Sequence, residues 1–126
     1  MLSQAKMVTA RARKAIESLY DGRCTISEYQ KVKKENKSTG FQEIVIHENL
    51  ACRLSFKSIN SANQSDTASS VGQTIKVFLA PEITVKPGSK LSITQNGVTT
   101  DYKASGKPAI YSTHQEIILE LFEGWA

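Results

Sequence analysis

The two histidines and two cysteines are the side chains whose chemistry could most directly serve catalysis or metal binding. Neither His47 nor His114 has a cysteine or carboxylate at metal-ligand spacing, although each has a glutamate close by in sequence. We expect His47 to face solvent on a strand, and His114 to cap a turn by hydrogen-bonding the backbone. No catalytic role is expected for either ring.

Cys24 and Cys52 do not form a C-x-x-C motif, and both fall at inward positions of alternating segments. We expect buried, reduced thiols that pack as small hydrophobic side chains, with a disulfide or a shared metal as the alternative. The sequence also lacks a G-x-x-x-x-G-K-S/T phosphate loop, a G-x-S-x-G elbow and an H-E-x-x-H motif. These observations predict a non-enzymatic protein with no cofactor and no metal.

The chain of 126 residues has the length of one domain, and its 40% hydrophobic and 22% charged residues are typical of globular proteins. Two cysteines are too few for a disulfide scaffold, and no window approaches the roughly 20 apolar residues of a membrane span. Residues 1–14 are charged and lack the apolar stretch of a secretory signal. We therefore expect a soluble, cytoplasmic protein of one domain without a membrane partner.

The first twenty-one residues are predicted to form an amphipathic helix. Ala5, Val8 and Ala12 belong to a thin apolar stripe at alternating spacings of three and four residues. Such a stripe must pack against something: a sheet, a partner subunit, or another part of the same subunit. Gly22 is expected to end the helix, because glycine accepts the left-handed backbone that follows a last helical turn.

From residue 23 onward the apolar residues alternate with period two, which is typical of strands. The strand-like segments are 23–32, 41–57, 74–80, 89–95, 98–102 and 116–122. Asn49 is expected to mark a break or bulge, and Asn96-Gly97 a tight two-residue turn. The predicted fold is mainly β, a small antiparallel β-barrel or sandwich of about six strands with an N-terminal helix. Within this single domain, 23–57 and 74–123 would form the barrel and 124–126 a C-terminal tail.

Residues 58–73 interrupt the strand pattern with five serines, two asparagines, two glutamines and one charge. They show no periodicity, and loops longer than about 12–15 residues in small domains are usually functional or disordered. The segment is predicted to be a long, flexible polar loop, either a tolerated surface insertion or a functional element. The functional interpretation involves its polar residues Ser58, Asn60, Asn63, Gln64, Asp66, Ser69, Ser70 and Gln73.

Positive charge is concentrated in residues 1–40, which hold nine basic and four acidic side chains, within a formal net charge of +4. Lys31, Lys33 and Lys34 fall at the tip of an expected hairpin. This end of the molecule could face nucleic acid or an acidic protein, or it could be a solvated helix face and hairpin tip. Trp125, next to the C-terminus, is expected either to dock on its own barrel or to insert into a neighbouring subunit.

Several short motifs in the second half of the chain resemble those of one protein family. K-P-G-S-K-L occupies residues 86–91, Y-x-x-S-G-x-P residues 102–108, and Y-S-x-H-x-E residues 111–116. The segment from Arg13 to Tyr29 also resembles the start of prophage members of this group. Together these motifs are similar to the head-closure (stopper), or head-tail connector, proteins of long-tailed bacteriophages and prophages. Ser89 stands where that family more often has aspartate.

The resemblance implies a neck protein of the virion, assembled in the bacterial host cytoplasm. Its subunits would form a homo-oligomeric ring of six-fold or twelve-fold symmetry between the portal or adaptor protein and the tail or tail-terminator protein. The ring would retain packaged double-stranded DNA and give the tail its docking surface, with residues 58–73 reaching into the channel. The isolated chain can still be monomeric, because such rings often form only on their partner.

Three groups of residues then become candidates for specific roles. Contacts with other subunits or partners would involve Ala5, Val8, Ala12, Arg13 and Trp125, and Lys31, Lys33 and Lys34 would face the DNA in the lumen. Two alternative functions stay open: a tail-terminator ring, and a small barrel-type protein that binds single-stranded nucleic acid. For the second, the aromatic residues do not alternate with basic ones in a recognisable motif.

Overall fold

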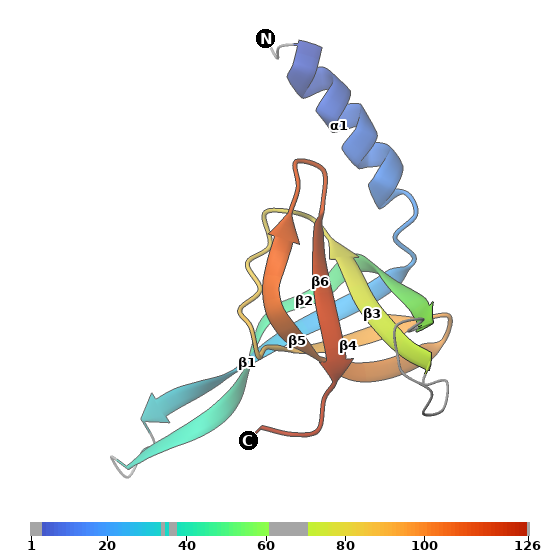
Figure 1. Cartoon of the computed structure of the whole chain (residues 1–126). Coiled ribbons are helices and arrows are strands. Elements are labelled where there is room, and N and C mark those ends of the chain that lie inside the picture. Colours follow the sequence, from blue (N-terminus) through green and yellow to red (C-terminus); the bar gives the residue numbers. More distant parts are fainter. Residues whose placement is uncertain (1–3, 34, 36–37, 61–70, 126) are drawn as a thin grey trace.

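A computed structural model describes residues 4–33, 35, 38–60 and 71–125 and forms one closed barrel preceded by a helix (Figure 1). Its elements are α1 (Gln4–Glu17), β1 (Gly22–Lys33), β2 (Thr39–Asn60), β3 (Val71–Leu79), β4 (Lys90–Gln95), β5 (Val98–Ile110) and β6 (Gln115–Leu121). The strands follow one another around the barrel in the order β1-β2-β3-β6-β5-β4, and every pair is antiparallel. The predicted mainly β fold, a six-stranded antiparallel barrel with an N-terminal helix, is confirmed.

The length of β2 allows the barrel to close. Its residues 39–52 pair with β1, and its residues 53–60 pair with β3 on the other edge. Where β1 begins, the side chain of Gln95 takes over the hydrogen bonds that β1 would make. Its Oε1 accepts from the Leu54 amide at 2.8 Å, and its Nε2 donates to the Leu54 carbonyl at 3.5 Å. One amide side chain at the end of β4 thus stands in for a strand at the barrel's seam.

The core is formed by the inward residues of all six strands, as period-two alternation requires. The fully buried aliphatic side chains are Ile26, Val77, Leu79, Leu91, Ile93 and Ile117. Cys24 and Cys52 pack among them with 1% and 0% of their surface exposed, and neither forms a disulfide. The expected burial of both cysteines is confirmed.

Two turns take the conformations that the sequence predicts. Asn96 and Gly97 both have positive φ, 53° and 76°, as a two-residue hairpin between paired Gln95 and Val98 requires. Asn49 has φ 54° at the place where the β1–β2 register shifts, so the expected bulge is present.

Gly22 does not have the role predicted for it. The helix ends at Glu17, before Gly22. Gly22 is instead the first residue of β1, and its φ is not positive. A side chain is excluded here for a different reason, since a Cβ on Gly22 would lie 3.0 Å from the Cys52 carbonyl oxygen and 3.1 Å from Gln95 Oε1. Glycine is needed because the barrel wall closes tightly at this point.

The long loop predicted at 58–73 is shorter than expected. Ser58 pairs with Gln73 and Asn60 with Val71, so β2 and β3 extend three residues further at each side. Ladder hydrogen bonds come from the backbone, and polar side chains therefore do not prevent two hairpin strands from continuing. Residues 61–70 lie outside the part of the chain that the structure describes.

β5 is also longer than its predicted range, because the pattern of 98–102 continues to Ile110 past a bulge. Between Ser105 and Ala109 the strand gains two residues relative to β6, and Gly106 has φ 72° there. Within the described ranges, no helix combines the length and hydropathy needed to cross a membrane.

Candidate functional site

The helix α1 points away from the barrel (Figure 1). Its apolar stripe is open to solvent: Val8 is 65% exposed, Leu19 beyond its end is 60% exposed, and Ala12 is exposed as well. The alternative in which the stripe packs against its own subunit is therefore not what the structure shows. The side chain of Ala5, also assigned to this stripe, lies outside the described set.

Arg13 on α1 links this arm to the barrel. Its guanidinium pairs with Glu17 one turn along the helix at 2.9 Å and with Glu82 in the loop after β3. The hydrogen bond from Arg13 holds the pKa of Glu82 below its usual value. Arg13, predicted as a contact with another subunit, is thus engaged within its own chain.

A second set of contacts fixes the start of β1 relative to the arm. Arg53 on β2 donates to the Leu19 carbonyl at 3.1 Å and lies 3.9 Å from the Asp21 carboxylate. Tyr20 lines a cavity of about 270 Å³ between the helix end and the barrel, together with Leu50 and Ile83. Burial, followed by the charge of Glu17, raises the pKa of Tyr20. Arg13, Leu19 and Tyr20 thus attach the arm to the barrel near the C-terminal end of α1.

At the other side of the molecule, β1 and β2 continue as a two-stranded ribbon beyond the barrel (Figure 1). β1 pairs with β4 only as far as Ser27, whereas its pairing with β2 runs on to Lys33 opposite Thr39. Alternation places Tyr29, Lys31 and Lys33 on one face of this ribbon, where Phe41 is opposite Lys31. Lys31 and Lys33 are exposed, and Phe41 is 60% exposed.

The C-terminal tail folds back onto this ribbon through Trp125. The indole stacks on Tyr29 with ring centroids 5.1 Å apart, Tyr29 stacks on Phe41 at 5.4 Å, and Phe122 meets the indole edge-on at 4.9 Å. Trp125 Nε1 also donates to Glu43 on β2 at 3.0 Å. We call Tyr29, Phe41, Phe122 and Trp125 the aromatic cluster. Of the two positions predicted for Trp125, the structure shows docking on its own subunit.

Lys90 completes the electrostatics of the aromatic cluster. Its ammonium lies 3.1 Å from Glu43 and 5.1 Å from the centre of the Phe122 ring. The hydrogen bond from Trp125 and then that from Lys90 lower the pKa of Glu43. This carboxylate is therefore ionised near neutral pH and joins the tail, β2 and β4 at one point.

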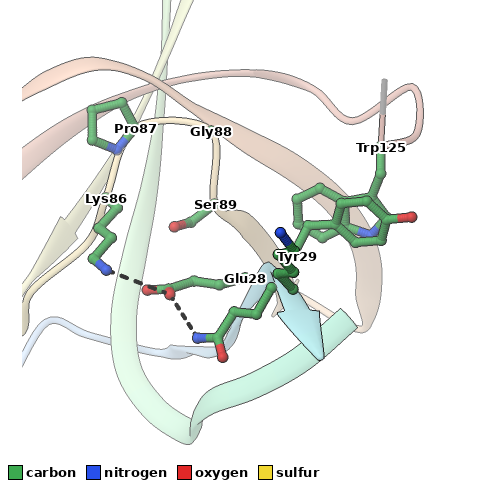
Figure 2. A pocket seen from close by; sticks show the side chains of 9 residues that line it. Glu28, Tyr29, Lys86, Pro87, Gly88, Ser89 and Trp125 are labelled. Atoms are coloured by element: carbon green, nitrogen blue, oxygen red, sulfur yellow. Dashed lines mark hydrogen bonds and ion pairs between the residues drawn. The ribbon is translucent and has the colours of Figure 1, made fainter. Parts of the chain in front are cut away.

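A groove of about 470 Å³ lies where the ribbon leaves the barrel (Figure 2). Its lining residues are Glu28, Tyr29, Gln30 and Lys31 from β1, the turn Lys86–Ser89, and Trp125. Figure 2 shows Lys86 directed at Glu28, from which its ammonium is 3.9 Å away. Gln30 Nε2 also donates to the Glu28 carboxylate, at 3.1 Å. The groove thus has a charged floor, an aromatic end and an extended strand along one side.

The turn that forms the other wall is fixed by the backbone. Gly88 has φ 88° and donates to the Ala104 carbonyl at 2.9 Å, and Ser89 donates to the Lys86 carbonyl at 3.1 Å. Ser89 is 3% exposed, and its hydroxyl has no hydrogen-bond partner within the described residues. Gln115 supports the preceding loop by donating to the carbonyls of Ala80 and Ile83.

The remaining predicted site residues are placed as follows. Asn63, Gln64, Asp66, Ser69, Ser70 and Lys34 lie outside the described residues, whereas Ser58, Asn60 and Gln73 belong to paired strands. Of the basic candidates, Lys31 and Lys33 share the exposed face of the ribbon, which projects from the barrel in a different direction from the arm (Figure 1). The structure therefore separates the predicted contacts into the arm and the ribbon.

His114 makes a different set of contacts from the predicted one. Its ring forms hydrogen bonds with Glu116 through Nε2 at 2.9 Å and with Thr113 through Nδ1 at 3.0 Å. The ring also stacks on Tyr111, with centroids 4.9 Å apart. The turn is closed by the backbone instead, where Tyr111 donates to the His114 carbonyl at 2.8 Å. In the part of the chain that the structure describes, no three His, Cys, Asp or Glu side chains gather as a metal site would require.

The aromatic cluster and its groove were not found by sequence reasoning. Tyr29, Phe41 and Trp125 are far apart in the chain, and only the long β1–β2 pairing together with the returning tail brings them together. The available signal was the period-two placement of Tyr29 with Lys31, and of Phe41 with Glu43, on either side of a hairpin tip.

Comparison with known proteins gives a relationship in fold. No family model matches the chain, and no curated protein matches its sequence. The solution structure of protein SF1141 from Shigella flexneri 2a is similar with a TM-score of 0.61 and 16% identity, over 80% of this chain and 91% of that one. The phage-like element PBSX protein xkdH from Bacillus subtilis is similar with a TM-score of 0.49 and 10% identity, over 80% and 93%. The chain therefore shares the fold of the Shigella protein.

Proposed function

We propose that the protein is a non-enzymatic structural component of a phage or prophage particle, a head-closure protein of the neck. Its subunits would form a ring between the portal or adaptor protein and the tail, closing the head after DNA packaging. The motifs at residues 86–91, 102–108 and 111–116 support this proposal through their resemblance to the head-closure family.

The observation that carries the proposal is the uncovered helix α1. An apolar stripe with Val8 65% exposed is costly in water, because apolar surface is stabilised by burial. The arm is attached to its barrel near one end through Arg13, so its stripe is presented outward. A ring needs two different surfaces on each subunit that meet head to tail. The arm and the ribbon, which point in different directions in Figure 1, supply two such surfaces.

Assembly on the particle's own connector tests the proposal. The full chain is mixed with the portal–adaptor complex of the particle to which it is proposed to belong, and ring formation is followed by analytical ultracentrifugation and negative-stain electron microscopy. We expect rings with the connector even where the free chain is a monomer. A chain that stays monomeric alone and adds no ring to the connector or to the tail contradicts the proposal.

The helix offers a matched pair of variants for this assay. Ala12→Asp places a charge in the apolar stripe, and Ala10→Asp places the same charge on the opposite face, both at exposed positions. We expect A12D to abolish ring formation and A10D to retain it, with equal helix content by circular dichroism. Equal ring formation by both variants would remove the arm from the interface.

A second function is favoured by one observation, the exposed face of the ribbon. Tyr29, Lys31 and Phe41 lie side by side there, and an aromatic ring beside a lysine is the arrangement that stacks a base next to a phosphate. Binding of oligonucleotides by the free chain, falling steeply with salt and lost in Lys31→Ala/Lys33→Ala, would identify a single-strand nucleic-acid-binding protein. Ring formation on the connector without such binding favours the neck protein.

A further inference from the structure

Within the described ranges, the outer edge of β1 has no neighbouring strand beyond the barrel. Pairing with β4 ends at Ser27 opposite Lys90, while β1 itself continues through Glu28–Lys33. Among the described residues, no strand pairs with this part of the edge, so the backbone groups that would point toward β4 face outward. An exposed row of amide and carbonyl groups is a template for another strand.

The groove of Figure 2 follows this open edge. Four consecutive residues of β1, from Glu28 to Lys31, line it, and consecutive residues of a strand point to opposite faces. Because all four of these β1 residues border the groove, it runs along the edge of the strand and does not lie over a single face of the ribbon. Its opposite wall, the turn Lys86–Ser89, includes Pro87, which has no amide hydrogen of its own to pair. We propose that this groove takes one extended strand of a different protein, added to the edge of β1.

The charges along the edge specify the kind of strand. Lys31 and Lys33 are exposed on one face, and the exposed ammonium of Lys86 stands across the groove, where its 3.9 Å separation from Glu28 makes only a loose pair. A second copy added antiparallel to this edge would bring its own Lys31 and Lys33 onto the same face, and like charges on paired strands are destabilising. The partner strand is therefore a foreign one that carries aspartate or glutamate at alternate positions.

This inference goes beyond the neck role and does not depend on it, because it rests on the open edge and its charges alone. Lysines at a sheet edge also prevent unwanted pairing, and here they do so selectively. They exclude lysine-bearing strands, the protein's own edge included, and leave the edge available to an acidic strand.

The single tryptophan of the chain provides the measurement. Trp125 lines the groove and stacks on Tyr29, so its fluorescence responds to a strand that enters there. The full chain is titrated with an eight-residue peptide that alternates glutamate with valine and threonine, capped at both ends. Hydrogen exchange of the Glu28–Lys33 amides is followed in parallel. We expect a saturable fluorescence change and slower exchange within Glu28–Lys33.

Two control peptides separate strand addition from charge attraction. One has the same side chains with alternate backbone amides N-methylated, which removes the hydrogen bonds of one peptide edge. The other has lysine in place of glutamate. Neither is expected to bind. In the variant Lys31→Glu/Lys33→Glu we expect the preference to reverse, with the acidic peptide about tenfold weaker and the lysine peptide now bound.

Three results would overturn the inference. The first is equal binding of the N-methylated peptide, because the backbone of the edge would then not be used. The second is a fluorescence signal that does not saturate, together with unchanged hydrogen exchange of the Glu28–Lys33 amides, at acidic-peptide concentrations up to about 1 mM. That concentration is the weak end of specific affinity. The third is lysine-dependent binding of duplex or single-stranded DNA in the groove while the acidic peptide fails to bind, since the charges would then serve phosphates.

Discussion

The indole of Trp125 lies over the phenol of Tyr29, with ring centroids 5.1 Å apart and planes inclined by 8°. Tyr29 belongs to the ribbon and Trp125 to the last residues of the chain, so this stack joins the C-terminus to the element that projects from the barrel. The indole N–H extends the link to Glu43 on β2. A tail that would otherwise fray thereby becomes part of the wall of the groove.

Trp125→Ala should destabilise the protein by about 2 kcal/mol, because it removes a stacked and an edge-on aromatic pair together with their buried area. Trp125→Phe keeps an aromatic ring but not the hydrogen bond to Glu43, and about half of that loss is expected. Urea unfolding followed by far-ultraviolet circular dichroism measures both. Equal stability of W125A and the parent chain would mean that the tail does not hold the ribbon in solution.

The barrel could be predicted from the sequence because its strands carry the signal on themselves. Ile26, Leu91 and Ile93 alternate with polar residues, and the core consists of such inward positions. The turn at Asn96-Gly97 was predictable from residue type alone. Gly22 was misassigned because crowding by Cys52 and Gln95 is a tertiary constraint, and no local pattern distinguishes it from a helix-ending glycine.

The candidate surfaces were less accessible to sequence reasoning. The apolar stripe through Val8 and Ala12 predicted an interface but could not show that the helix leaves its own barrel. The extension of β2 to Asn60 was missed because polar side chains conceal a strand that is held by backbone pairing. The open edge beyond Ser27 follows from the unequal lengths of β1 and β4, which only the register reveals.

Arg13→Ala should release the arm while leaving the barrel nearly unchanged. Exposed ion pairs contribute only about 0–1 kcal/mol, and Arg13 loses its pairs with Glu17 and Glu82. A helix of 14 residues is marginal without tertiary support, so amide exchange in α1 should accelerate while the strands exchange as before. Arg11→Ala, at an exposed position on the same helix, is the control. Faster exchange in the strands as well would show that the arm supports the barrel.

Gly22→Ala should cost about 1–3 kcal/mol through overpacking. The new Cβ would meet the Cys52 carbonyl oxygen at 3.0 Å, Gln95 Oε1 at 3.1 Å and Cys52 Sγ at 3.2 Å. Gly106→Ala provides the contrast, since it has φ 72° but no atom within 4 Å of an added Cβ. Its cost comes from backbone strain alone. Thermal unfolding of both variants tests this, and a neutral Gly22→Ala would contradict the tight closure at the seam.

The stability of the protein should fall as the pH drops below about 5, with Glu116 as one cause. The hydrogen bond from His114 and then that from Lys76 lower the pKa of Glu116 in the folded state. A lowered carboxyl pKa gives stability that is present above the unfolded value of about 4.3 and is lost as the pH falls through the folded value. Glu116→Gln should therefore flatten the decline between about pH 5 and 3, measured by urea unfolding at each pH. Glu123→Gln, an exposed carboxylate beyond β6, should leave the decline in place.

Both thiols should resist modification until the barrel unfolds. Cys24 is 1% and Cys52 0% exposed, so reagent cannot reach either thiol in the folded barrel. The hydrogen bond from Cys24 to Cys52 raises the pKa of Cys24 and lowers that of Cys52, so the protection of Cys52 comes from its burial. A disulfide reagent can reach the thiols only when the barrel opens. Labelling should therefore be about a thousandfold slower in native buffer than in denaturant. Two thiols should react per denatured chain, without prior reduction. In Cys24→Ala and in Cys52→Ala the labelling rate belongs to the one thiol that remains. Rapid reaction of either thiol in native buffer would mean that the seam of the barrel near Gly22 opens independently of the rest.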